Sequence, residues 1–374
     1  MVYLSPLSNP NRTRPMLARS LVIAFATALL AASLQAQYAT RPLTHNNAPD
    51  NSPQISDSGF VTYAGFDGND YEIFLLDTST NQSIQLTNNN YPDRQPRINT
   101  LGHVVWEGQT YSGVGNKDLF LFDGNTTMRL TTDTVDDVSP RINDSGQITW
   151  ARYDGQDFEV FLFDSGVITQ ITDNADYDWN PQINNAGHLA WEGGSGNREI
   201  FFFDGVNTTN VSNNPNDDTG VRLNNQDHLA WAQWDGTDWE IMLFNGVSAT
   251  QVTNNDHYDA APVLNDWDQL AWLAFPTADG TTDGEIFYFD GVSTLQLTDN
   301  NLTDWQPQIN NNGSVAWSGD FGSEIYIRDA NGIEKLSNTQ FSDGFPSLNN
   351  SDAVVWAGYP NQNDSEIFLA WRVR

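Results

Sequence analysis

Short apolar runs separated by polar turn residues recur along the whole chain. The stretch from Val138 to Asp178 contains four such runs, at 139–143, 147–151, 159–163 and 169–172. Each run is rich in β-branched or aromatic residues, and Gly, Asn or Asp stands in every gap, as in β-strands joined by tight turns. The connections are short enough for neighbouring runs to pair antiparallel. The pattern therefore predicts a four-stranded meander, whose strands we call A, B, C and D in chain order.

This unit is repeated eight times. Its most recognisable member is an aromatic residue in strand B, and successive copies of it lie 39 to 45 residues apart. The copies are Tyr63, Trp106, Trp150, Trp191, Trp231, Trp272, Trp317 and Trp356. Eight four-stranded units at this period predict an all-β, eight-bladed β-propeller of antiparallel blades, with each B-strand aromatic residue buried between blades.

The order of runs at the two ends predicts how the ring closes. The repeats begin with a D run at Thr40–Thr44 and end on a C run at Ser365–Trp371. An N-terminal strand that completes the last blade would remove two free sheet edges. The alternative is a seven-bladed ring with a loose end, which would leave one set of strands unused.

The repeats form one domain, residues 37–374, and leave no room for another. The predicted units are 52–93, 94–137, 138–178, 179–218, 219–259, 260–304, 305–343 and 344–374 with 40–51.

Residues 1–36 have the pattern of a signal peptide. Arg12, Arg14 and Arg19 precede an apolar core at Leu21–Ala32, and Ala36 offers a cleavage site. Translation from Met16 would give a more ordinary signal, and an uncleaved membrane anchor is the alternative. No later apolar segment is long enough to span a bilayer. We expect a secreted or periplasmic product with no membrane insertion after removal of the signal.

Net charge narrows the range of partners. The chain has 48 acidic against 16 basic residues, a formal charge of -32, and no cysteine. Such a surface repels nucleic acid and anionic lipid, and it disfavours uronic or sulfated polysaccharides. Many of the acids are Asp in turns, where they cap their own backbone. The expected partner is a protein or a neutral glycan, and the expected state is a monomer.

The repeat resembles the TolB-type (PD40, WD40-like) propeller repeat family. One copy matches the family pattern at Leu297-Thr298, Asp304, Pro307, Asn310–Gly313, Trp317 and Glu324-Ile325-Tyr326. Here Ile-Asn-x-x-Gly turns replace the family's Ser-Pro-Asp-Gly turn. The resemblance covers residues 40–374 and implies the propeller fold. It does not choose among functions, since similar proteins include protein-binding periplasmic modules and polysaccharide lyases.

In such a blade the D–A and B–C loops share one rim, which here is irregular in length. Variable loops on a rigid scaffold usually carry function. An Asp recurs in every D–A loop, at Asp50, Asp93, Asp137, Asp178, Asp218, Asp259, Asp304 and Asp343. A ring of eight carboxylates would suit a cation or a hydroxyl-rich ligand. We interpret them instead as caps of backbone N–H groups, because function seldom needs eightfold repetition.

Residues that break the repeat are better candidates for a binding site. The rim carries Tyr177, Trp179, Trp234, Trp239, Tyr258 and Trp305 beside Asp154, Asp157, Asp235 and Asp238. Aromatic faces next to carboxylates suit stacking on sugar rings or the centre of a protein interface. Packing of these rings between adjacent loops is the alternative.

Signals for metals and catalysis are weak. The turns Asp67–Asp70, Asp154–Asp157 and Asp235–Asp238 group oxygen ligands of the type that calcium takes, although turn capping explains them as well. No nucleophile elbow, phosphate loop or zinc-protease motif occurs, and no acid–base pair is visible. We assign no catalytic residue and, calcium apart, no cofactor.

The sequence therefore favours a secreted or periplasmic, non-catalytic binding propeller that uses its acidic, aromatic rim. The alternative is an exported glycan-active enzyme such as a polysaccharide lyase.

Overall fold

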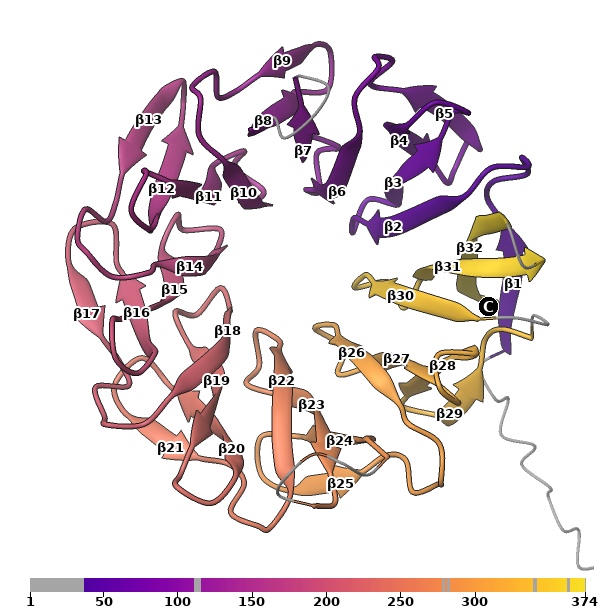
Figure 1. The fold of residues 1–374 in the computed structure, drawn as a ribbon. Helices are drawn as coiled ribbons and strands as arrows, with labels where there is room; N and C mark the ends of the chain where they lie inside the picture. Colours follow the sequence, from indigo (N-terminus) through magenta and orange to yellow (C-terminus); the bar gives the residue numbers. More distant parts are fainter. Residues whose placement is uncertain are drawn as a thin grey trace, which may run out of the picture. The chain divides into compact units, whose positions relative to one another are not determined.

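The computed structural model describes residues 37–110, 116–277, 280, 283–338, 342–361 and 364–373. The predicted signal peptide, 1–36, lies outside the described residues and stays a prediction. The described strands form eight sheets of four antiparallel strands. Together they make the ring of Figure 1, which confirms the predicted eight-bladed propeller.

The A strands lie around the centre of the ring, and the D strands lie outermost (Figure 1). The A strands are β2 (Asp50–Ile55), β6 (Asp93–Ile98), β10 (Asp137–Ile142), β14 (Trp179–Ile183), β18 (Asp218–Leu223), β22 (Tyr258–Leu264), β26 (Trp305–Ile309) and β30 (Asp343–Leu348). The B strands are β3 (Phe60–Phe66), β7 (Val104–Gln109), β11 (Ile148–Tyr153), β15 (Leu189–Gly193), β19 (Leu229–Trp234), β23 (Leu270–Phe275), β27 (Val315–Gly319) and β31 (Val354–Asn361).

The C and D strands complete each sheet on its outer side. The C strands are β4 (Tyr71–Asp77), β8 (Lys117–Phe122), β12 (Phe158–Asp164), β16 (Glu199–Phe203), β20 (Trp239–Phe244), β24 (Glu285–Phe289), β28 (Glu324–Asp329) and β32 (Asp364–Val373). The D strands are β5 (Gln82–Gln85), β9 (Thr127–Arg129), β13 (Val167–Gln170), β17 (Thr208–Asn210), β21 (Ala249–Gln251), β25 (Thr294–Gln296), β29 (Gly332–Lys335) and β1 (Gln37–Pro42). We number the blades 1 to 8, from the sheet of β2 to the sheet of β30.

Blade 8 is built from both ends of the described chain. Strand β1 pairs antiparallel with β32, from Gln37 opposite Val373 to Pro42 opposite Phe368. The phenol of Tyr38 donates to Asp329 of blade 7, and the same carboxylate pairs with Arg372. The predicted closure is confirmed, and the seven-bladed alternative is wrong.

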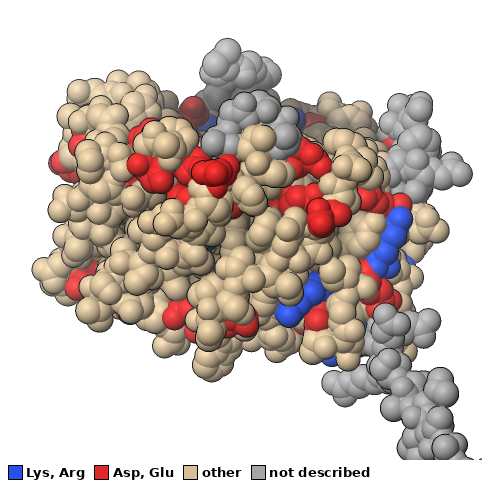
Figure 2. All heavy atoms as spheres, turned by 90° about the horizontal axis from the view of Figure 1, so that it is seen from below, with Lys and Arg blue, Asp and Glu red and all other residues tan. Residues whose placement is uncertain are grey.

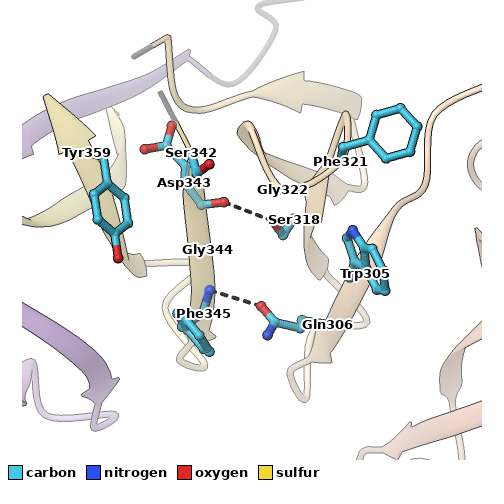
Figure 3. A pocket seen from close by; sticks show the side chains of 10 residues that line it. All are labelled: Trp305, Gln306, Ser318, Phe321, Gly322, Ser342, Asp343, Gly344, Phe345 and Tyr359. Atoms are coloured by element: carbon cyan, nitrogen blue, oxygen red, sulfur yellow. Dashed lines mark hydrogen bonds between the residues drawn. The ribbon is translucent and has the colours of Figure 1, made fainter. Parts of the chain in front are cut away.

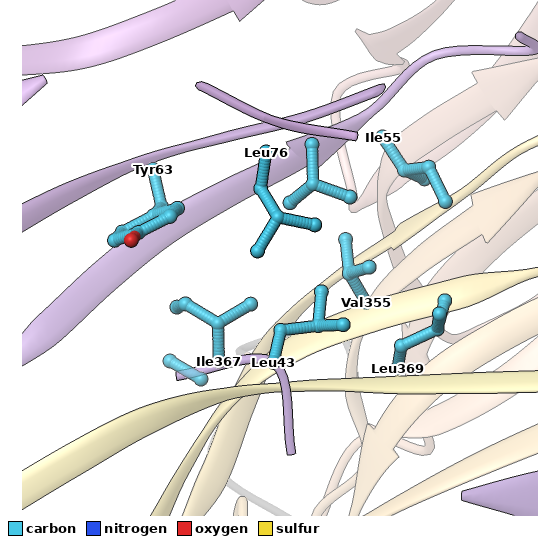
Figure 4. Close-up of a cluster of buried hydrophobic side chains, with 9 residues drawn as sticks. Leu43, Ile55, Tyr63, Leu76, Val355, Ile367 and Leu369 are labelled. Atoms are coloured by element: carbon cyan, nitrogen blue, oxygen red, sulfur yellow. The ribbon is translucent and has the colours of Figure 1, made fainter. Parts of the chain in front are cut away.

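The core lies between blades. The B-strand Trp residues are 0 to 1% exposed. Six of them stack on an aromatic residue of strand C, with ring centroids 5.7 to 5.9 Å apart. At the closure, Leu43, Tyr63, Leu76 and Ile367 join one apolar cluster from blades 1 and 8 (Figure 4). The predicted burial of the repeated aromatic residues is therefore confirmed.

A ladder of Asn side chains links the A–B turns around the ring. Each Asn donates its side-chain amide to a main-chain carbonyl of the next blade at 2.8 to 3.1 Å. The donors are Asn99, Asn143, Asn184, Asn224, Asn265, Asn310 and Asn349. Blade 1 has Ser56 in this place, and Asn349 of blade 8 donates to its carbonyl. The ladder therefore crosses the junction that β1 and β32 also close.

Every A strand contains a bulge at the same place. The pairing with strand B shifts register between Asn51 and Gln54, and at the equivalent point in the other seven sheets. The bulged residues have φ between 50 and 73°. They are Ser52, Gln95, Ser139, Asn180, Gly220, Ala261, Gln306 and Phe345. Only one is glycine, so the ring holds seven side chains in a backbone region that is unfavourable for them.

The side of the ring shows many acidic and few basic side chains (Figure 2). Among the described residues, no helix is long and apolar enough to cross a membrane.

Candidate functional site

A cavity lined by aromatic residues lies on the D–A and B–C rim, between blades 7 and 8. We call it the rim pocket. Its volume is about 550 Å³, which is in the usual range for small-molecule sites. It is lined by Trp305, Gln306, Ser318, Phe321, Gly322, Ser342, Asp343, Gly344, Phe345 and Tyr359.

Two blades supply the walls of the rim pocket. Trp305 and Phe321 come from blade 7, and Phe345 and Tyr359 come from blade 8 on the opposite side (Figure 3). The side chains of Trp305, Phe321 and Phe345 are 42, 60 and 53% exposed. Aromatic faces left open on both sides of a cleft can sandwich a flat or ring-shaped ligand.

Hydrogen bonds between the two blades hold the walls in place. Phe345 N–H donates to Gln306 Oε1 at 3.0 Å, and Ser318 Oγ donates to the carbonyl of Asp343 at 2.9 Å (Figure 3). Asp343 N–H donates to the carbonyl of Gly322 at 2.9 Å. The rim pocket is therefore fixed before a ligand arrives, because each of the three contacts uses a main-chain atom of blade 8 as donor or acceptor.

The walls of the rim pocket include residues with positive φ, two at the bulge that all blades share and two in the B–C loop of blade 7. Gln306 and Phe345 occupy the left-handed bulge position with φ of 54 and 58°, and Asp320 and Phe321 have φ of 56 and 63°. Strained residues of this kind persist where the surrounding structure determines them, and they are common at ligand sites.

The proposed rim aromatics do not form one site. Tyr177 and Trp179 pack on Phe158, with ring centroids 6.2 and 4.7 Å away. They stay largely open to solvent, with exposed fractions of 58 and 38%. They form a separate exposed cluster over blades 3 and 4.

Trp234, Trp239 and Tyr258 form another cluster. The ring of Trp239 lies between those of Trp234 and Tyr258, at 6.0 and 6.2 Å. Tyr258 also packs edge-on against Phe275 at 5.8 Å. All three are half-buried, which agrees with the packing alternative for this group. Of the six predicted aromatics, Trp305 lines the rim pocket.

The carboxylates predicted beside the aromatics divide into turn caps and buried acids. Asp154 Oδ1 accepts from the N–H groups of Gln156 and Asp157 at 2.8 and 3.1 Å. Asp235 Oδ1 accepts from the N–H groups of Thr237 and Asp238 at 2.8 and 3.2 Å. Turn capping is therefore confirmed for Asp154 and Asp235.

Asp157 and Asp238 instead belong to carboxylate triads. Three triads have ligand oxygens within 4.8 Å of one another, namely Asp67–Asp70–Glu72, Asp154–Asp157–Glu159 and Asp235–Asp238–Glu240. The repeated Glu that opens strand C completes each triad; from the sequence we interpreted it as structural and did not count it among the oxygen ligands. The Asp-Gly-x-Asp-x-Glu spacing shared by the three blades was the available signal. Such clusters can hold a metal ion.

The middle acid of each triad is buried with an unsatisfied oxygen. Asp70, Asp157 and Asp238 are 8, 4 and 2% exposed. The Oδ1 atom of each has no hydrogen-bond partner among the described residues. Burial first, and then the charges of Glu72 and Asp67, raise the pKa of Asp70 to about 6. Burial and neighbouring carboxylates also raise the pKa values of Asp157 and Asp238. A bound cation would satisfy these oxygens.

The repeated Asp of the D–A loop has a structural role. These residues are 0 to 2% exposed. In five blades the Oδ1 atom accepts from the indole of the strand B Trp at 2.6 to 3.1 Å. In six blades the Oδ2 atom accepts from an Asn amide of the preceding loop at 2.7 to 3.0 Å. The interpretation as a cap was right about the role, but the partners are side chains rather than backbone N–H groups.

Sequence reasoning missed Phe321, Phe345 and Tyr359 in the rim pocket. Phe345 was detectable, because it is a large aromatic at a repeat position that holds small or amide residues in most blades. Phe321 lies in the B–C loop of blade 7, and Tyr359 lies near the end of β31, before a B–C connection of irregular length, so equivalent positions cannot be aligned by counting.

Comparison with known proteins identifies this chain by its fold alone. No family model matches the sequence, and no curated protein matches it. Solved structures do match, and they share the propeller fold: the β-propeller domain of the Trilobed protease from Pyrococcus furiosus is 13% identical with a TM-score of 0.50, over 68% of this chain and 82% of that one.

Two of the similar structures are peptidases. Acylaminoacyl peptidase of Pyrococcus horikoshii is 12% identical with a TM-score of 0.50, over 76% of this chain and 51% of that one. A puromycin-hydrolyzing peptidase of Mycobacterium tuberculosis is 14% identical with a TM-score of 0.57, over 83% and 57%. The chain thus spans about half the length of the peptidases it matches.

Oligogalacturonate lyase matches over nearly its whole length. The enzyme of Vibrio parahaemolyticus is 12% identical with a TM-score of 0.54, over 90% of this chain and 97% of that one. An oligogalacturonate lyase in complex with manganese is 13% identical with a TM-score of 0.55, over 92% and 95%.

These matches correct the prediction of a non-catalytic binding module. The similar propellers occur in enzymes, both peptidases and lyases. The sequence pattern could not reveal this, because the fold repeats while catalytic groups need appear only once. The alternative, a glycan-active enzyme, agrees better with the matches.

Proposed function

We propose that the chain is an exported glycan-active enzyme of the polysaccharide lyase type, and that it binds its substrate in the rim pocket. We also propose that its repeats belong to the TolB-type (PD40) family. The observation that carries the function is a pre-formed cleft with Trp305 and Phe321 on its blade 7 side and Phe345 and Tyr359 on its blade 8 side. Sugar rings present flat C–H faces that stack on such aromatic walls.

The comparison that supports the lyase type is the match to oligogalacturonate lyases, which covers those proteins almost end to end. Tyr359 is the candidate for proton transfer, because its phenolic hydroxyl can accept or donate a proton at the cleft. Ser318 and Asp343 are positioning residues, since their hydrogen bond joins the two blades.

The test is incubation of the purified protein with a panel of polysaccharides. We expect new products with unsaturated ends, which absorb in the ultraviolet. Tyr359→Phe should lower turnover about 100-fold or more while glycan binding is retained, because it removes only the hydroxyl group. Trp305→Ala should weaken binding, whereas Trp267→Ala is the matched control, since Trp267 is 70% exposed and outside the rim pocket.

New reducing ends without unsaturated products would make the chain a hydrolase and contradict the lyase type. Absence of both products from every glycan that binds would contradict the enzymatic function as a whole.

We further propose that the three carboxylate triads bind calcium. Oxygen ligands from Asp and Glu are those that calcium prefers, and the buried Oδ1 atoms of Asp70, Asp157 and Asp238, which have no hydrogen-bond partner among the described residues, support cation binding. Calcium would offset the repulsion among the acids and tie each B–C turn to strand C.

Calcium binding should stabilise the folded chain, by about 2.7 kcal/mol for each site at 100 times the Kd. The melting temperature should rise with added calcium and fall on chelation. Asp157→Asn should reduce this response. Asp204→Asn is the control, because Asp204 caps a turn with 2.8 and 2.6 Å bonds but belongs to none of the triads. An unchanged melting temperature in calcium and in chelator would contradict the proposal.

A further inference from the structure

One repeat position faces the central channel in seven of the eight blades. It is the second residue after the left-handed bulge in strand A. In seven blades it lines a cavity of about 440 Å³ in the channel. These channel-ring residues are Gln54, Arg97, Arg141, Gln182, Arg222, Val263 and Gln308. The ring thus consists mainly of amides and guanidinium groups.

The three arginines of the channel ring have no acidic partner. Among the described residues, no carboxylate lies within ion-pairing distance of Arg97, Arg141 or Arg222. This is notable in a chain with 48 acidic and 16 basic residues. Other cations do find acids, such as Arg129 with Asp118 at 2.7 Å.

The acids that act electrostatically on the channel arginines are bound elsewhere. Glu107 pairs with Lys117 at 2.9 Å and accepts from the N–H of Ser139 at 2.8 Å. Glu192 accepts from the side chains of Asn180 and Thr219, both at 2.9 Å. Both carboxylates therefore already have donors, and neither neutralises a guanidinium group directly.

Most of the guanidinium donors remain available. Arg97 Nη1 donates to the carbonyl of Pro96 at 3.2 Å, and Arg222 Nη1 donates to that of Val221 at 3.0 Å. The structure records no protein acceptor for Arg141 among the described residues. A guanidinium group has five N–H donors, so the channel holds a set of donors that the protein leaves unused.

The three guanidinium charges destabilise the channel ring. Burial, and then the charges of Arg97 and Arg222, lower the pKa of Arg141 well below its usual value. Burial likewise lowers the pKa values of Arg97 and Arg222. Like charges enclosed together without a counter-charge are unfavourable, so their presence points to a ligand that relieves them.

We propose that the central channel is a binding site for a carboxylate anion, held by Arg97, Arg141 and Arg222. A carboxylate fits because its two oxygens match the fork of a guanidinium group. The amides of Gln54, Gln182 and Gln308 supply neutral donors and acceptors around it, as a hydroxyl-bearing sugar acid requires.

The acidic net charge of the chain gives no indication of this anion site. Acidity over the whole surface argues against anionic ligands, but a ligand inside the channel meets the arginine ring first. Gln306 and Phe345 line both the channel cavity and the rim pocket, so the two cavities are neighbours. Binding in the channel needs no turnover, and the failure of the proposed enzymatic function would leave it intact.

Calorimetry with small probes tests the site. The probes are D-glucuronate, D-glucose as its neutral match, malonate as a free carboxylate and inorganic phosphate. We expect glucuronate and malonate to bind, and glucose to bind much more weakly. Arg141→Gln should weaken both carboxylates at least tenfold. Gln is a suitable replacement because it occupies the same repeat position in blades 1, 4 and 7.

Arg94→Gln is the matched control. Arg94 lies on β6 with Arg97, but it is exposed and stacks over Tyr71 at 5.2 Å, so carboxylate affinity should not change. A second readout is thermal unfolding without anion. Arg141→Gln should melt at a higher temperature than the parent and gain less from malonate, because the repulsion that the anion relieves is already reduced.

Measurable binding of glucuronate and glucose with equal affinity would overturn the proposal, and so would unchanged malonate binding in the Arg97→Gln, Arg141→Gln and Arg222→Gln variants. Phosphate binding without binding of either carboxylate would overturn the assignment of the ligand class. Binding of malonate but not of glucuronate would support a site for small free carboxylates, and binding of both would support a sugar acid.

Discussion

At the scale of the residue, Trp191 shows what the repeated aromatic does. Its indole N–H donates to Asp178 Oδ1 at 2.9 Å, and its ring stacks on Phe201 at 5.7 Å. One side chain thereby joins strands A, B and C of blade 4. The Asp and the Trp were both visible as repeats, but their pairing was not, because a spacing of 13 residues does not reveal strand register.

Removal of this side chain should be costly. We expect Trp191→Ala to lower the free energy of unfolding by about 3–5 kcal/mol, since it leaves a cavity and an unpaired carboxylate. Denaturant unfolding of the variant measures the loss.

Trp267→Ala is the control, because Trp267 is 70% exposed and should contribute little. A loss below about 1 kcal/mol for Trp191→Ala would argue against the observed packing.

At the scale of the element, the A strands explain what sequence could and could not predict. Alternation and turn residues predicted the strands and their order. They did not predict that Arg97, Arg141 and Arg222 face the channel. The bulge before each of these residues inserts one extra position, which moves the following side chains to the other face.

The contribution of the N-terminal strand β1 to ring closure can be tested with a substitution next to it. Leu43 follows β1 and is 6% exposed among Tyr63, Leu76 and Ile367 (Figure 4). We expect Leu43→Ala to lower the free energy of unfolding by about 2–5 kcal/mol, because the cavity opens at the junction of blades 1 and 8.

Val206→Ala serves as the comparison, since Val206 lies in the turn between β16 and β17 and is 82% exposed. Similar unfolding curves for the two variants would mean that the N-terminal segment does not hold the ring.

At the scale of the whole molecule, the repeat count predicted the ring, but not where the rim pocket forms. The pocket depends on loops from two neighbouring blades that contact across a junction. Trp305 was found because it stands out in its own repeat. Tyr359 and Phe321 could not be found, since single-repeat patterns carry no information on which loops meet.

Buried acids distributed around the ring predict an unusual pH response. Burial raises the pKa values of Asp50 and Asp93 to about 7, and those of Asp218 and Asp304 to about 6. Between these values and the ordinary pKa near 4, the folded chain holds protons that the unfolded chain has released. Stability should therefore rise as the pH falls from about 7 to about 5.

Melting temperatures across this range, in buffer free of calcium, measure the effect. Asp93→Asn imitates the protonated form at one site and should make the profile flatter. A melting temperature that falls steadily on acidification would contradict the raised pKa values.

The antiparallel pairing of β1 with β32 places Gln37 opposite Val373. A few added residues would suffice to join them as a hairpin, and the exposed loop at Val206 offers a place to open the chain instead. The blades would then follow one another along the chain in a circularly permuted order. Strand β17 would be the N-terminal strand that completes the last blade, as β1 is now. Where the polypeptide starts is thus incidental to this architecture, and a circular permutant should regain the native fold.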